Sequence, residues 1–113
     1  MIRASFFRNS ENFFWGFELS GHAGFAEEGK DIVCAAVSAL AQNTVNSIEA
    51  FADEIPEVRI GEEGYFFCCV ASLKEGKSNE KAELLLRSFK LGLDEISKEY
   101  GKSYLKVTSN KRA

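Results

Sequence analysis

Residues 21–40, GHAGFAEEGKDIVCAAVSAL, bring together side chains that can carry out nucleophilic chemistry. Asp31 is a favoured helix N-cap residue, because its carboxylate can accept hydrogen bonds from the free amides of the first helical turn. Cys34 then falls at the third helical position, where these amides and the positive end of the helix dipole favour the nucleophilic thiolate. The pattern therefore predicts a reactive thiol at Cys34, with a small buried apolar residue as the alternative.

The only histidine of the chain, His22, precedes this helix start. A neutral imidazole within reach of Cys34 would serve as a general base and later as an acid for a leaving amine. The alternative is an ordinary residue of a surface loop. Asp31 likewise has two interpretations, since it can cap the helix or orient His22 as the third member of a triad.

Gly24 and Gly29 lie between the histidine and the cysteine, and Gly21 directly precedes the histidine. This composition favours a mobile flap over residues 21–30 that orders when a substrate binds, although turn formation alone would also explain it. Ser38 follows Cys34 by one helical turn and could point into the same cleft or bond back to the helix backbone. It is a secondary candidate.

Flanking patterns predict the elements that must position these residues. Aromatic and apolar runs at Ile2–Phe7 and Phe13–Leu19, separated by a polar turn, indicate a β-hairpin in which Gly16 marks a bulge or a close backbone approach. Phe13, Trp15, Phe17 and Leu19 should face the core. The helix that Asp31 caps should continue to about Ala52.

The second half of the chain repeats this plan. It predicts a hairpin of two strands at 57–60 and 65–72, followed by a polar loop at 74–77. A helix capped by Ser78 or Asn79 should follow over 79–100. A short strand at 104–108 and a fraying tail at 109–113 complete the chain. The apolar strand YFFCCVA should be central in the sheet. The order ββαββαβ predicts an α+β fold, a mainly antiparallel sheet with two helices packed on one face.

Composition places the chain among ordinary globular proteins. Its 113 residues predict a single domain, 1–113, and a net charge of −3 argues against a non-specific nucleic-acid binder. The three cysteines include the adjacent pair Cys68 and Cys69, predicted to be core residues, so we expect no disulfide framework and a reducing cytoplasm. We expect no signal peptide, no membrane span, no metal site and no cofactor.

The strings GHA at 21–23 and GKDIVCAAVSAL at 29–40 resemble the ribosomal-processing cysteine proteases of the Prp family. The resemblance implies that His22 is the catalytic base, that Cys34 is the nucleophile, and that Asp31 and Ser38 lie near the site. It also implies a homodimer with a flap over the active site. In such a mechanism the first-turn amides of the helix would stabilise the oxyanion.

The same resemblance implies a bacterial endopeptidase that removes a short N-terminal extension, ending in aromatic residues, from the large-subunit ribosomal protein L-twenty-seven during ribosome maturation. The expected partner is this ribosomal protein precursor, with no direct nucleic-acid contact. Two other hypotheses remain open at this point. One is a non-catalytic ribosome-associated binding module in which Cys34 is inert, and the other is a thiol redox sensor.

Overall fold

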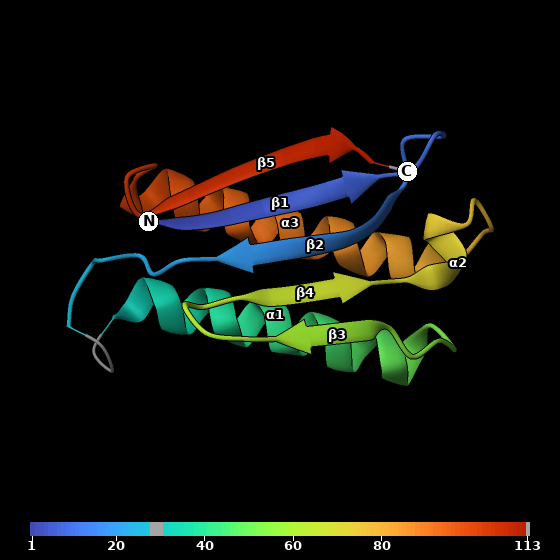
Figure 1. The fold of residues 1–113 in the computed structure, drawn as a ribbon, viewed down its shortest axis with the longest axis horizontal. Helices are drawn as coiled ribbons and strands as arrows, with labels where there is room; N and C mark the ends of the chain where they lie inside the picture. The colour runs from blue at the N-terminus through green and yellow to red at the C-terminus, as the bar shows by residue number, and fades with distance from the viewer. Residues whose placement is uncertain (28–30, 113) are drawn as a thin grey trace.

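The computed structural model describes residues 1–27 and 31–112. The elements, in chain order, are β1 Ile2–Arg8, β2 Phe14–Ser20, α1 Ile32–Phe51, β3 Glu57–Ile60, β4 Phe66–Cys69, α2 Ala71–Lys74, α3 Glu80–Tyr100 and β5 Leu105–Lys111. The strands form one sheet in the order β3-β4-β2-β1-β5, in which β1 and β5 are parallel and the other pairs antiparallel. Both long helices cover the same face of this sheet (Figure 1). The predicted α+β architecture is confirmed.

An aromatic cluster joins the sheet to the helices. The centroid of the Phe89 ring, from α3, lies 5.5 Å from the ring centroid of Phe6 and 4.6 Å from that of Phe17. All three side chains are buried. Buried aromatic side chains contribute large apolar areas to a core, with a further gain from edge-on ring contacts. This cluster fixes α3 against β1 and β2.

Gly16 lies at a β-bulge, as its position in the sequence suggested. Phe7 pairs with Gly16 but Arg8 pairs with Phe14, so Trp15 is the extra residue of β2. A side chain at Gly16 would collide with the backbone carbonyl of Cys68, which explains the glycine. Trp15 is buried in the core as predicted, but the bulge turns its ring to the face of the sheet opposite that of Phe17.

On that other face, the Trp15 ring stacks on Phe7, with 5.1 Å between ring centroids. Phe7 follows Phe6 in the strand and therefore points away from the helices. Phe13, predicted to face the core, precedes β2 and is 49% exposed.

Two further expectations for the second half of the chain need correction. The strand predicted at 65–72 ends at Cys69, and the helix α2 follows because the Lys74 amide donates to the Val70 carbonyl. The order is therefore ββαββααβ. β4 lies inside the sheet between β3 and β2, but the middle strand is β2.

The tail predicted to fray is ordered through Lys111. Residues 109–111 continue β5, which pairs with β1 as far as Arg8 opposite Lys111. The Arg112 amide also donates to the Arg8 carbonyl at 3.0 Å, and the Arg112 carbonyl accepts from the Trp15 indole at 2.9 Å. Backbone pairing therefore stabilises a segment whose side chains are too polar to predict a strand.

The molecule is elongated, with a longest dimension of 41 Å. The segment after β2 and the β3–β4 turn lie at one end, while α2, the β1–β2 turn and the C-terminus lie at the other (Figure 1). Within the described residues, no helix is long and apolar enough to span a membrane.

Candidate active site

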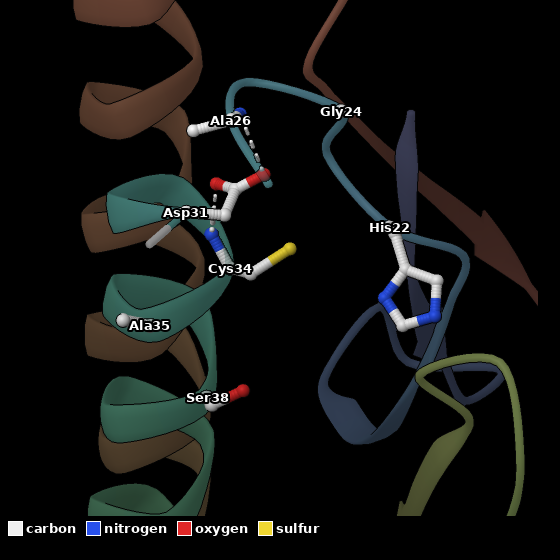
Figure 2. Close-up of a pocket in the computed structure, with 7 residues that line it drawn as sticks. All are labelled: His22, Gly24, Ala26, Asp31, Cys34, Ala35 and Ser38. Carbon is white, nitrogen blue, oxygen red and sulfur yellow. Dashed lines mark hydrogen bonds between the residues drawn. The ribbon is translucent and has the colours of Figure 1, made fainter. Parts of the chain in front are cut away.

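Cys34 lies in the first turn of α1, as predicted. Its side chain is half-buried, and its Sγ accepts a hydrogen bond from the Ala23 amide at 3.3 Å. This contact joins the start of α1 to the segment that follows His22. Figure 2 shows the sulfur pointing from the helix into the space in front of His22.

Asp31 is the N-cap of α1 and also holds the preceding segment. One carboxylate oxygen accepts from the amides of Val33 and Cys34, each at 3.0 Å. The other accepts from Phe25 at 2.9 Å and from Ala26 at 3.4 Å. These four hydrogen bonds hold the pKa of the Asp31 carboxyl below its ordinary value of 3.8, and the bond from the Cys34 amide has the largest effect. This buried carboxylate is therefore ionised at neutral pH and connects the helix start to residues 25–26.

His22 is positioned by contact between two turns. The Gly21 amide donates to the Glu63 carbonyl at 2.7 Å, which joins the end of β2 to the β3–β4 turn. Gly21 and Gly64 both have positive φ, at 86° and 70°, and a Cβ on Gly64 would collide with the Gly21 carbonyl. Only residues without a side chain allow this approach.

The approach places a carboxylate beside the imidazole. Glu63 Oε2 lies 3.7 Å from His22 Nε2, and both side chains are mostly exposed. Because Nε2 faces Glu63, Nδ1 is the ring nitrogen left for the thiol. Figure 2 shows the imidazole across the cleft from Cys34 and Ser38.

Two adjoining hollows flank this pair of residues. The first, about 450 Å³, is lined by His22, Gly24, Ala26, Asp31, Cys34, Ala35 and Ser38. The second, about 300 Å³, is lined by Ile2, Leu19, Gly21, His22, Cys34, Val37, Ser38, Ile60, Gly61, Gly64, Tyr65 and Phe66. Since His22, Cys34 and Ser38 belong to both linings, the hollows form one trough past the sulfur. Its second part is apolar and aromatic.

The described part of the predicted flap crosses the first hollow. Gly24, with φ of 72°, lines it, and the Phe25 ring is held edge-on by Tyr100 at 5.5 Å and Tyr104 at 5.1 Å. Residues 21–27 are thus fixed at Gly21, at Phe25 and through Asp31. The third flap residue, Gly29, lies outside the described residues.

The structure brings four of the predicted residues, His22, Asp31, Cys34 and Ser38, to one cleft. It confirms the capping role of Asp31, whereas the carboxylate beside His22 belongs to Glu63. Ser38 is exposed and lies on the cleft side of α1 in Figure 2.

Sequence reasoning missed Glu63. The only signal was the turn GEEG at 61–64, which does not by itself point to His22.

Three amides at the start of α1 already have hydrogen-bond partners within the chain. Those of Val33 and Cys34 donate to the Asp31 carboxylate, and that of Ala35 donates to the Asp31 carbonyl. Capping and oxyanion binding compete for the same donors. The Ala23 amide differs from these, because it donates to the reacting sulfur itself.

The remaining cysteines differ from Cys34 in their surroundings. Cys68 and Cys69 are buried free thiols, and burial raises the pKa of Cys68 to about 12 and that of Cys69 above its ordinary value. Both are therefore neutral and shielded. Within residues 1–27 and 31–112, no three His, Cys, Asp or Glu side chains gather as a metal site would require.

Comparison with known proteins identifies the family. The model of the family described as cysteine protease Prp matches residues 1–106. The chain belongs to the Prp family of cysteine proteases. It is 37% identical over 111 residues to the ribosomal processing cysteine protease Prp of Bacillus subtilis, covering 97% of this chain and 98% of that protein. It is also 33% identical over 85 residues to Prp of Staphylococcus aureus strain Mu50, a match that covers 75% of this chain and 77% of that protein.

Solved Prp structures share the fold. Prp from S. aureus with a covalently linked product peptide superposes with a TM-score of 0.88 at 28% identity, covering 97% of this chain and all of that one. The structure of the same protease with a substrate peptide superposes with a TM-score of 0.82 at 27% identity, again covering 97% of this chain and all of that one. The protein described here is accordingly a cysteine protease with the Prp fold.

Proposed function

We propose that this protein removes the N-terminal extension of the large-subunit ribosomal protein L-twenty-seven in the cytoplasm, through a Cys34–His22 dyad. The observation that carries the proposal is the placement of Cys34 Sγ at a capped helix start, opposite the only imidazole of the chain. The curated relatives, named ribosomal processing proteases, support a ribosomal substrate. Because the chain belongs to a protease family, we set aside the hypotheses of an inert binding module and of a redox sensor.

The reaction follows from the positions of the two side chains. Cys34 Sγ, deprotonated by His22, attacks the scissile carbonyl carbon, and a tetrahedral oxyanion forms. We infer that the Ala23 amide stabilises this oxyanion. His22 then protonates the departing amine, leaving a thioester on Cys34. Water, deprotonated by His22, attacks the thioester, and the new carboxyl terminus leaves as the thiol is restored.

Glu63 acts as a positioning residue for His22. Its carboxylate lies 3.7 Å from Nε2, which is outside hydrogen-bond distance, so it acts on the imidazole through its charge and leaves Nδ1 to take the thiol proton. It also favours the imidazolium that forms during the reaction.

The trough suits an extended peptide. Its apolar half, which includes Tyr65 and Phe66, offers a surface for the aromatic residues at which the extension ends. The segment 21–30 then serves as the flap over the other half, where Gly24 lines the cleft. The homodimer implied by the resemblance stays a prediction, which sedimentation analysis of the purified chain can test.

The proposal is tested with the extended ribosomal protein precursor and the mature protein as a control. We expect the wild-type enzyme to release an N-terminal peptide, detected by intact mass, and both Cys34→Ala and His22→Ala to leave the precursor whole. Gln42→Ala, at an exposed position of α1 outside the cleft lining, serves as the control and should cleave as the wild type does. Cleavage by Cys34→Ala at the wild-type rate would overturn the dyad, while an untouched precursor in every reaction would overturn the substrate.

A further inference from the structure

A basic hollow of about 420 Å³ lies at the end of the molecule opposite the active site. Strands β1 and β5 both end there, at the same end of the molecule as α2 (Figure 1). The lining of the hollow includes Arg8, Lys74, Lys111 and Arg112. The acidic residue of its lining, Glu75, is paired with Lys77 at 3.4 Å. Four cations thus share one concave surface on a chain whose net charge is −3.

Strand pairing forces two of these cations together. Arg8 and Lys111 are direct partners in the parallel register of β1 and β5. Like charges opposite each other on neighbouring strands are unfavourable. An anion between them would relieve this repulsion.

The other two cations lie over a pair of stacked rings. The Lys74 ammonium lies 5.0 Å from the ring centroid of Trp15, and the Arg112 guanidinium lies 4.6 Å from that of Phe7. Both rings are buried, so each cation lies over a fixed aromatic surface, and both cations line the hollow. Cation–π contact stabilises the positive charges without neutralising them.

Among the described residues, no carboxylate forms an ion pair with any of the four cations. The ion pairs found there join other residues. Arg8 Nη1 donates to the neutral amide of Asn12 at 3.1 Å, and Arg8 Nε is buried without a hydrogen-bond partner among these residues. The fold therefore concentrates positive charge and leaves it unpaired.

We propose that this hollow binds the phosphate backbone of RNA. Guanidinium and ammonium groups recognise phosphate strongly, and several cations along one surface suit a chain of evenly spaced phosphates. The choice of RNA over an acidic protein segment rests on the proposed function, which brings the enzyme to a ribosomal protein. The net charge argued against RNA binding over the whole surface, but local charge decides binding at one end.

The test measures RNA binding separately from proteolysis. Wild-type protein is titrated into a fluorescently labelled 12-nucleotide single-stranded RNA, followed by anisotropy from 0.05 to 0.3 M salt. We compare Lys74→Gln/Lys111→Gln with Lys102→Gln/Lys106→Gln, which makes the same charge change outside the hollow. Cleavage of a short peptide substrate by each variant is measured in parallel, so failure of the protease assignment remains distinguishable.

We expect a log–log salt slope of about −3 for four phosphate contacts, since each contributes about −0.7 on single strands. Loss of two contacts should weaken binding roughly 25-fold at 0.1 M salt and reduce the slope by about 1.4. The control pair should bind as wild type, and peptide cleavage should not change in either variant. Equal losses in both variants, or no binding at 0.05 M salt, would refute the proposal. Tighter binding of a poly-glutamate peptide than of RNA would assign the hollow to an acidic protein instead.

Discussion

Removal of the Glu63 charge should slow peptide cleavage by a small factor that depends on salt. Glu63 Oε2 lies 3.7 Å from His22 Nε2, and the two side chains are 86% and 56% exposed. At this distance in water, Coulomb's law gives about 1 kcal/mol for a full charge pair, the upper end of the range measured for exposed pairs. The attraction acts on the imidazolium that forms in the transition state, so losing about 1 kcal/mol there lowers the cleavage rate about fivefold.

The assay is kcat/KM for a quenched fluorescent peptide that spans the cleavage site. Glu63→Gln removes the charge and keeps the size of the side chain, whereas Glu63→Ala removes both, so their difference separates side-chain bulk from electrostatics. Glu62→Gln is the matched control, because it changes the same charge one residue away in the same turn. Gln and Glu have the same branching at the backbone, so the positive φ of residue 63, 56°, affects both alike.

Salt separates an electrostatic role from a structural one. At 1 M salt the Debye length is about 3 Å, shorter than the His22–Glu63 distance, so the Glu63→Gln defect should largely disappear. Equal rates for Glu63→Gln and Glu62→Gln at low salt would refute the role of Glu63. A defect above about 100-fold that persists at high salt would equally refute this reasoning, since an exposed pair cannot supply that energy.

Three further predictions follow from burial, pKa and packing. One equivalent of iodoacetamide should label the native protein at Cys34 alone, shown by peptide mapping, because Cys68 and Cys69 are buried and their raised pKa values keep them neutral; labelling of all three at similar rates would contradict this. The stabilising effect of ionised Asp31 is complete above its unfolded pKa of about 3.8 and is lost as pH falls through the lower folded value, so Asp31→Asn should flatten acid unfolding below pH 4, monitored by circular dichroism. Gly16→Ala should cost about 1–3 kcal/mol in urea unfolding, because its Cβ meets a backbone carbonyl that cannot rotate away; an unchanged midpoint would show that the bulge adjusts.

Most of the scaffold could be predicted because its signals are local. The Asp31 cap, the helical periodicity after it and the cap of α3 at Ser78 or Asn79, which the structure places at Asn79, were predicted from neighbouring residues. The glycine at position 16 likewise predicted its bulge. Capping and turn formation depend on a few adjacent residues, so they can be recognised without the rest of the chain.

The side of the sheet that Trp15 faces could not be predicted, because a bulge inverts the alternation that follows from strand geometry. The tail at 109–113 was predicted to fray as a chain end, whereas its residues 109–111 continue β5. Its order comes from pairing with a strand about 100 residues earlier. Backbone hydrogen bonds to a distant strand have no counterpart in the local sequence.

The sequence by itself determined which residues carry the chemistry: a thiol at a helix start and a single imidazole before it. Only the tertiary structure decided what surrounds them. It placed Glu63 beside His22 through the contact of two glycine turns, occupied the first-turn amides with Asp31, and gathered four cations at the far end. Each of these depends on segments far apart in the chain, whose distances are set by packing of the whole domain.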